Sequence, residues 1–107
     1  MKTTIVAEIG SNWEGSVSRA KKIIEECEDA GADAVKFQMW RAKDLYSITH
    51  PQWNVIKKSE LTFEKATQIK KISDSMGIEF FCSIFSWFYF LINCFAITRS
   101  EATGYYF

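Results

Sequence analysis

The chain has 107 residues, and its 13 Lys and Arg residues balance its 13 Asp and Glu residues, so the formal net charge is zero. This length holds one domain at most and excludes a large closed barrel. A neutral balance also lacks the basic excess that nucleic acids and anionic membrane surfaces attract, so we expect neither partner. Three cysteines without a C-x-x-C pair, and no cleavable signal segment, predict a reducing, cytoplasmic compartment.

The first third of the chain predicts a strand, a helix and a second strand. Thr3 to Ile9 is rich in β-branched residues and is bounded by Gly10, as expected of a strand. A helix should follow from an N-cap at Ser16 to Ala30, because apolar residues recur there at helical spacing and Gly31 can form the C-cap. Ala34 to Gln38 then predicts the second strand.

The middle third predicts a long loop, a second helix and a third strand. Residues 39–60 show no clear period, so we expect a loop with one helical turn. A helix should run from an N-cap at Thr62 to Met76 and end at Gly77, and Ile78 to Ser83 predicts the third strand. This alternation of strands and helices is typical of βαβ units and predicts a parallel sheet.

The last part of the chain has a different character. Of the 26 charged residues, only Glu79, Arg99 and Glu101 follow position 76, and 15 of the 18 residues from Phe80 to Ile97 are apolar. A membrane-spanning helix needs about 20 apolar residues, and the third strand uses the start of this run. We therefore favour a strand followed by a short buried helix from Trp87 to Ile97 over membrane contact.

Polar residues end the first two predicted strands. Side chains alternate faces along a strand, so Glu8 lies on one face of the first strand, while Lys36 and Gln38 share one face of the second. The carboxyl ends of parallel strands hold the ligand sites of open α/β sheets and (β/α)8 barrels. A carboxylate, an ammonium and an amide suit a small substrate with hydroxyls and an anionic group. The alternative is an internal Glu8–Lys36 ion pair that only neutralises two charges.

Three further positions are weaker candidates. The turn from Gly10 to Gly15 contains Asn12 and opens a helix, but it lacks the glycine spacing of a phosphate-binding loop, so an ordinary turn is favoured. Ser83 ends the third strand and has a hydroxyl that suits a phosphate. His50, the only histidine, has no second ligand nearby and predicts a solvated loop residue.

Three segments together resemble a known enzyme family. They read VAEIGSNWEGS at Val6–Ser16, AGADAVKFQ at Ala30–Gln38 and KKSELTFEKATQIKKISDSMGIEFFCSIF at Lys57–Phe85. In order and spacing they are similar to the N-terminal part of the sialic acid (N-acetylneuraminate) synthase family, which includes legionaminate and pseudaminate synthases. The resemblance covers residues 1–86, whereas residues 87–107 form a divergent aromatic tail in which ATG at Ala102–Gly104 resembles the family's fourth-strand motif.

The resemblance implies a partial (β/α)8 barrel of three to four β/α units and a role in carbohydrate biosynthesis. In this family phosphoenolpyruvate condenses with an N-acyl-mannosamine-type sugar, and a divalent metal ion (Mn²⁺ or Mg²⁺) polarises the sugar aldehyde. By position, Glu8 would hold the sugar, and Lys36 and Gln38 would contact phosphoenolpyruvate and the reacting carbons. Asn12, Gln38, Ser83 and Thr103 would bind substrate.

The sequence also departs from the family pattern. Trp13 stands where the family usually has His, Ile84 where it has Pro, and Ser100 where it has a phosphate-binding Lys. The metal-binding histidines of the family have no counterpart here. We therefore expect a truncated synthase-like domain that is inactive alone. The alternative is a non-catalytic module, which would associate through an open sheet edge and the aromatic tail and which suits a homo-oligomer.

Overall fold

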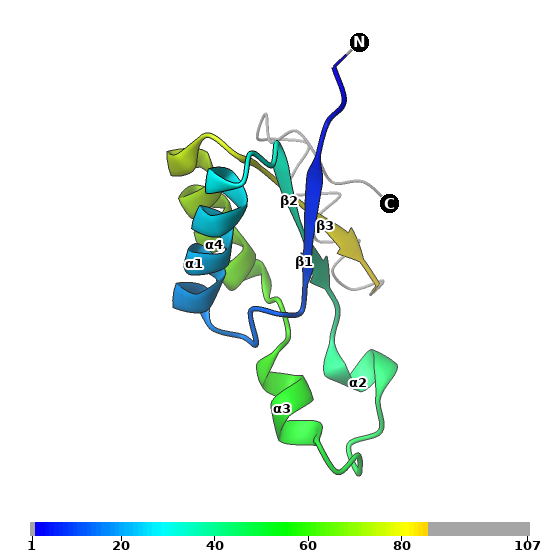
Figure 1. Cartoon of the computed structure of the whole chain (residues 1–107). Helices are drawn as coiled ribbons and strands as arrows, with labels where there is room; N and C mark the ends of the chain where they lie inside the picture. Colours follow the sequence, from blue (N-terminus) through cyan, green and yellow to red (C-terminus); the bar gives the residue numbers. More distant parts are fainter. Residues whose placement is uncertain (1, 86–107) are drawn as a thin grey trace.

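The computed structural model describes residues 2–85, which form a three-stranded parallel sheet covered by helices (Figure 1). The strands β1 (Val6–Gly10), β2 (Ala34–Met39) and β3 (Glu79–Ile84) lie in the order β1-β2-β3, with both neighbouring pairs parallel. The predicted parallel α/β architecture is confirmed.

Two long helices, α1 (Val17–Asp29) and α4 (Phe63–Met76), lie side by side on one face of the sheet (Figure 1). The predicted N-caps are confirmed, because the hydroxyls of Ser16 and Thr62 each accept a hydrogen bond at 3.2 Å from the backbone N–H three residues later. Gly77 ends α4 in the left-handed conformation with φ 71°. At the end of α1 the cap residue is Ala30, and Gly31 follows it with φ 88°.

The core fills the space between these helices and the sheet. Along β2 the side chains of Val35, Phe37 and Met39 are fully buried, and Ile24 and Ile69 meet them from α1 and α4. Since successive residues of a strand point to opposite faces, this pattern places Lys36 and Gln38 on the face away from α1 and α4.

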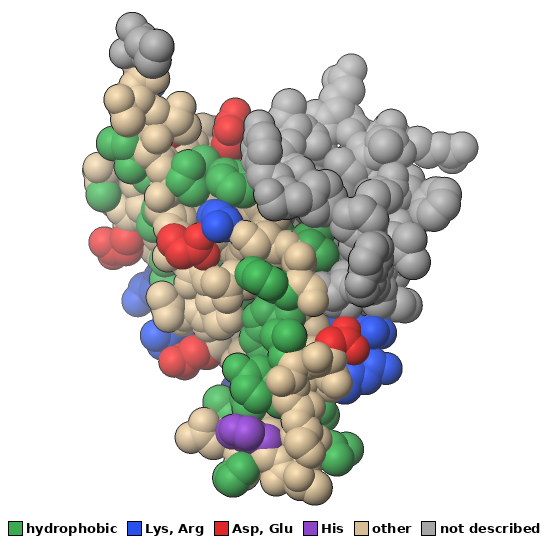
Figure 2. Space-filling view, turned by 90° about the vertical axis from the view of Figure 1, so that its right-hand side faces the viewer, with side chains coloured by type: hydrophobic (Ala, Val, Ile, Leu, Met, Phe, Trp, Pro, Cys, Tyr) green, Lys and Arg blue, Asp and Glu red, His purple; other side chains and the backbone are tan. Residues whose placement is uncertain are grey.

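An excursion of the chain between β2 and α4 carries two short helices, α2 (Ala42–Leu45) and α3 (Trp53–Lys58), which project beyond the carboxyl ends of the strands (Figure 1). The sequence predicts one helical turn here. The sequence does not predict a second helix here because neither α2 nor α3 has a side-chain N-cap and both are too short to show a period. Figure 2 shows His50 at the projecting end, beside hydrophobic side chains, and the exposed hydrophobic residues of the excursion are Leu45, Tyr46, Ile48 and Val55.

The strand boundaries differ from the prediction at the start of β1. Thr3 to Ile5 lie outside the strand because Asp33 occupies both backbone hydrogen-bonding groups of Ile5. The Asp33 carboxylate accepts the Ile5 N–H at 2.8 Å, and the Asp33 backbone N–H donates to the Ile5 carbonyl at 2.9 Å. The predicted helix from Trp87 to Ile97 lies outside the described residues. Within residues 2–85 no helix is both long and apolar enough to cross a membrane.

Gly15 marks a close contact between the turn after β1 and the end of α3. It has φ 77°, and a Cβ atom at this position would collide with the backbone carbonyl of Lys58. Lys65 of α4 also donates from Nζ to the Gly15 carbonyl at 3.0 Å. The first turn is therefore held against both α3 and α4.

The close contact between Gly15 and Lys58 predicts that Gly15→Ala loses more stability than the matched variant Gly31→Ala. Gly31 also has positive φ but has open space where a Cβ would lie, so Gly31→Ala should lower the free energy of unfolding by only the cost of a left-handed residue, about 1–2 kcal/mol. Gly15→Ala adds the overlap with Lys58 and should lose about 1–3 kcal/mol more. Urea denaturation measures both values, and equal losses would contradict the close contact.

Asp33 predicts a pH dependence of stability. The Ile5 N–H, with a smaller contribution from Lys2, lowers the pKa of the Asp33 carboxyl below its ordinary value. A carboxyl whose pKa is lower in the folded state adds stability above its unfolded pKa and loses it as the pH falls through its folded pKa. Asp33→Asn should therefore destabilise the chain at pH 7, and the difference from wild type should shrink on acidification. Asp29→Asn, at an exposed carboxylate of α1, is the control, and a difference independent of pH would refute the assignment.

Candidate functional site

The pairing of β1 with β2 brings Glu8 and Lys36 together. The two residues are directly opposite in the parallel register, and Lys36 Nζ lies 3.0 Å from Glu8 Oε2. Both lie near the middle of their strands, on the face away from α1 and α4, and Gln38 is closer to the carboxyl end of β2. The convergence expected from strand alternation is thus present in the structure.

A second row of polar groups lies one step further along the strands. Gln38 of β2 is in register with Ser83 of β3. On the other side, a Cβ atom on Gly10 would lie 3.5 Å from Gln38 Nε2 and 3.6 Å from Glu8 Oε1. The side chains of Glu8 and Gln38 therefore converge over a residue that has no side chain of its own.

Gly10 shapes the end of β1 as well. The register with β2 is irregular between Glu8 and Gly10, so that Gly10 pairs with Phe37, and Gly10 has φ 58°. A left-handed residue in a strand irregularity is typically glycine, because a Cβ atom is strained there. The sequence indicates Gly10 as a strand boundary and the start of a turn, and it gives no sign of this irregularity.

Sequence reasoning also missed Phe81. It is in register with Lys36 on the opposite side from Glu8 and is half-buried. The available signal was the period of two in the third strand, which puts Phe81 and Ser83 on one face. The row across the three strands is thus a carboxylate, an ammonium and an aromatic ring.

The other predicted residues lie elsewhere. Asn12 is exposed in the turn after β1, where its backbone carbonyl accepts a hydrogen bond from Arg19 Nε at 3.0 Å. Thr103 lies outside the described residues. His50 belongs to the excursion, as expected of a loop histidine: its Nδ1 accepts the Gln52 N–H at 3.1 Å, and its ring lies 5.5 Å from that of Tyr46.

The exposure of the Glu8–Lys36 pair bears on the two interpretations of it. The Glu8 side chain is 49% exposed and that of Lys36 is 32% exposed. Charged groups with this much access to water remain hydrated, so neither needs an ion pair to offset a cost of burial. Exposed ion pairs also contribute little to stability. The geometry therefore favours a pair that is available to a ligand.

The described residues do not fit a metal centre. Among residues 2–85 no three His, Cys, Asp or Glu side chains lie close enough together to hold a metal ion. Glu8 is the only acidic member of the group formed by Glu8, Lys36, Gln38 and Ser83, and an ammonium lies against it. We therefore derive no chemical step through a metal ion from these residues.

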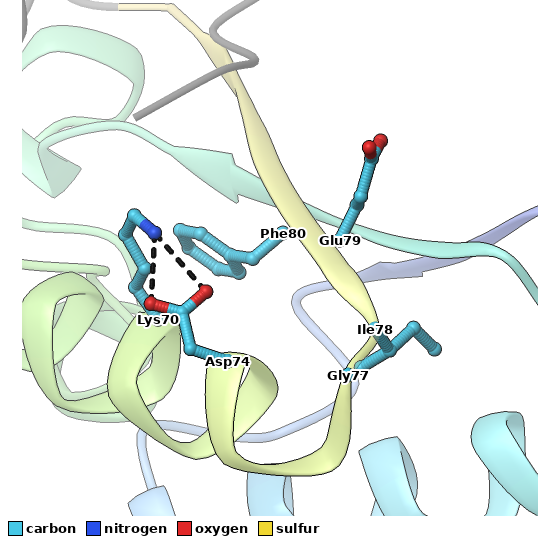
Figure 3. Close-up of a pocket in the computed structure, with 6 residues that line it drawn as sticks. All are labelled: Lys70, Asp74, Gly77, Ile78, Glu79 and Phe80. Carbon is cyan, nitrogen blue, oxygen red and sulfur yellow. Dashed lines mark hydrogen bonds and ion pairs between the residues drawn. The ribbon is translucent and has the colours of Figure 1, made fainter. Parts of the chain in front are cut away.

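A separate hollow of about 210 Å³ lies at the opposite end of β3 (Figure 3). Two of its charged groups are paired, since Lys70 Nζ donates to both carboxylate oxygens of Asp74 at 3.1 and 2.9 Å. Phe80 lies beside this pair, and Glu79 points away from it (Figure 3). The hollow therefore lacks the convergent groups found at the strand ends, and its ion pair is a convenient control for the site.

Comparison with known proteins identifies the family. The model of the NeuB family matches residues 23–90. The chain belongs to the NeuB family. It is 32% identical over 94 residues to an N,N'-diacetyllegionaminic acid synthase of Legionella pneumophila, an alignment that covers 75% of this chain and 26% of that protein. The predicted membership in the sialic acid synthase family is confirmed.

Two solved structures share the fold. The N-acetylneuraminic acid (sialic acid) synthetase of Leptospira borgpetersenii matches with a TM-score of 0.73 and 29% identity, over 81% of this chain and 30% of that one. The spore coat polysaccharide biosynthesis protein SpsE of Bacillus subtilis matches with a TM-score of 0.65 and 25% identity, over 88% and 27%. This chain thus forms part of a (β/α)8 barrel, as predicted. It spans about a quarter of the length of two of the relatives it matches and less of the others.

The exposure of the Glu8–Lys36 pair gives a test that separates its two interpretations. Glu8→Gln keeps the shape of the side chain and removes its charge, so the free energy of unfolding should fall by no more than about 1 kcal/mol. Urea denaturation of both chains at low salt measures the difference. A loss above about 3 kcal/mol would instead indicate a structural pair whose breaking leaves a charge without compensation.

Proposed function

We propose that the group formed by Glu8, Lys36, Gln38 and Ser83 binds the substrates of a nonulosonic acid synthase, phosphoenolpyruvate and an N-acyl-mannosamine-type sugar. Membership in the NeuB family and the similarity to proteins named as legionaminic and sialic acid synthases support this role. The observation that carries the proposal is the convergence of Glu8 and Lys36, 3.0 Å apart, on the face of the sheet away from α1 and α4.

The chemistry of each side chain fits one part of these substrates. The Lys36 ammonium is a compact point charge that suits the carboxylate or phosphate of phosphoenolpyruvate. The Gln38 amide and the Ser83 hydroxyl lie in the next row and can donate to the same anion. The Glu8 carboxylate accepts hydrogen bonds and suits the hydroxyls of a sugar.

The proposed reaction forms one carbon–carbon bond and one carbon–oxygen bond, the latter from water, and it breaks the carbon–oxygen bond to phosphate. The methylene carbon of phosphoenolpyruvate attacks the aldehyde carbon of the open-chain sugar, and the aldehyde oxygen takes up a proton. Water adds to the carbon that bears the phosphate and loses one proton. The new hydroxyl then loses its proton as the bond from this carbon to the phosphate oxygen breaks, which leaves a ketone and inorganic phosphate. The group described here can contribute the binding and relative orientation of the two substrates, which is worth a large rate factor because it converts an encounter into a positioned reaction.

A matched pair of lysine variants tests the proposal. Lys36→Met should weaken phosphoenolpyruvate binding by roughly tenfold or more, because a hydrogen bond to a charged group is worth about 1.5–3 kcal/mol. Lys70→Met removes an ion-paired lysine outside the site and should leave affinity unchanged. Isothermal titration calorimetry measures both dissociation constants.

The competing ligand for this experiment is pyruvate, which lacks the phosphate and should bind more weakly than phosphoenolpyruvate. Unfolding curves of each variant establish that the chain is folded at the temperature of titration. A wild-type chain without measurable affinity for phosphoenolpyruvate, or equal losses in Lys36→Met and Lys70→Met, would overturn the proposed function.

A further inference from the structure

Glu60 is a nearly buried carboxylate at the base of the excursion that carries α2 and α3. Its side chain is only 7% exposed. Oε1 accepts the backbone N–H of Ala42 at 2.6 Å and Lys57 Nζ at 3.0 Å, and Oε2 accepts Lys57 Nζ at 2.9 Å. All of its described hydrogen bonds therefore lie within the excursion.

These contacts join the two ends of the excursion. Ala42 is the first residue of α2, and the N-cap residue Arg41 makes no side-chain capping bond there. Glu60 instead supplies the acceptor from 18 residues further along the chain. A buried carboxylate is costly unless it is paired and hydrogen-bonded, and Lys57 and the Ala42 N–H satisfy that need.

The segment that Glu60 holds follows directly on the ligand-binding row of β2. Gln38 is followed by the buried residues Met39 and Trp40 and then by Arg41 and Ala42. The Met39 carbonyl accepts the Phe85 N–H at 2.9 Å, just beyond Ser83 in β3. Residues 39–42 are thus fixed at one end by β3 and at the other by Glu60.

We propose that Glu60 is a positioning residue for the site: by holding Ala42, it fixes residues 39–42 and so sets the place of the Gln38 amide beside Glu8. The inference rests on the proposed function for the identity of the ligand. Glu60 itself touches no ligand in this scheme, because its carboxylate is used by Lys57 and Ala42. Its contribution is to keep the end of β2 in the binding geometry before the ligand arrives.

Three variants separate the parts of this network. Glu60→Leu removes both contacts. Glu60→Gln keeps a side-chain oxygen for the Ala42 N–H and loses the ion pair, whereas Lys57→Met loses the ion pair and leaves the carboxylate on Ala42. The control is Asp74→Asn, which breaks the ion pair of similar length between Lys70 and Asp74 on α4, outside the site.

The first readout needs no ligand. In the full chain labelled with ¹⁵N, Glu60→Leu should shift the side-chain amide signals of Gln38 and accelerate hydrogen exchange of the Ala42 N–H at least tenfold. Glu60→Gln should restore most of the Ala42 protection, and Asp74→Asn should change neither signal. If Glu60→Leu does not fold, Glu60→Gln and Lys57→Met are compared with wild type instead. Lys57→Met should then shift the Gln38 signals less than Glu60→Gln does. Unchanged Gln38 signals in the folded variants would overturn the positioning role.

The second readout is the affinity for phosphoenolpyruvate. A misplacement of about 1 Å can cost up to a hundredfold in a positioned site, so we expect Glu60→Leu to weaken binding about tenfold, Glu60→Gln less, and Asp74→Asn not at all. Wild-type affinity in Glu60→Leu would overturn the inference and leave the proposed function intact. A wild-type chain that does not bind phosphoenolpyruvate would overturn the proposed function, and the Gln38 signals would still decide the positioning role.

Discussion

The parallel pairing of β1 with β2 is the constraint on which the site depends. Its register sets Glu8 opposite Lys36, and the irregularity at Gly10 then lets the Gln38 amide approach the same carboxylate. Neither contact arises from neighbours in the sequence, since 28 positions separate Glu8 from Lys36. The chemistry at this edge of the sheet is therefore a product of strand alignment, and the buried face of β2 maintains that alignment by packing against α1 and α4.

The loops at the carboxyl ends of the strands are held both by buried side chains such as Trp13 and Trp40 and by contacts to the loop backbone. Gly15 brings the turn after β1 against the carbonyl of Lys58 at the end of α3, and two residues later in the chain Glu60 holds the start of α2. The end of α3 thus fixes the turns that follow both β1 and β2. These contacts position the rim of the site from outside it, so its polar groups can stay open to solvent and ligand.

The sequence predicts those parts of this structure that depend on local rules. The caps at Ser16, Thr62 and Gly77 follow from hydrogen bonds within four residues, and the shared face of Lys36 and Gln38 follows from strand alternation. The same alternation predicts from the sequence alone that Glu8 and Lys36 can meet across neighbouring strands. Family resemblance selects the same residues by a separate route, through matching motifs.

The features that sequence reasoning missed depend on contacts between distant positions. Glu60 does not stand out among the many charged residues of the sequence. Only the fold shows that its side chain is buried and accepts the N–H of Ala42, 18 residues away. The late start of β1 has the same origin, because Asp33 binds the backbone of Ile5 across 28 positions. The helices α2 and α3 escape detection for a different reason, since they are too short for a periodic pattern and have no capping side chain.

The polar residues of β2 have a second consequence, for the fidelity of folding. Val35, Phe37 and Met39 on one side of this strand alternate with Lys36 and Gln38 on the other. A slip of one residue against β1 would turn the charged ammonium toward the helices and leave three apolar side chains in water. The misaligned state would bury a lysine away from Glu8, which is its partner in the native register. The residues that we assign to substrate binding thus also penalise the wrong strand alignment. A variant with an apolar residue at position 36 would therefore lose both its ligand and its preference for the native register.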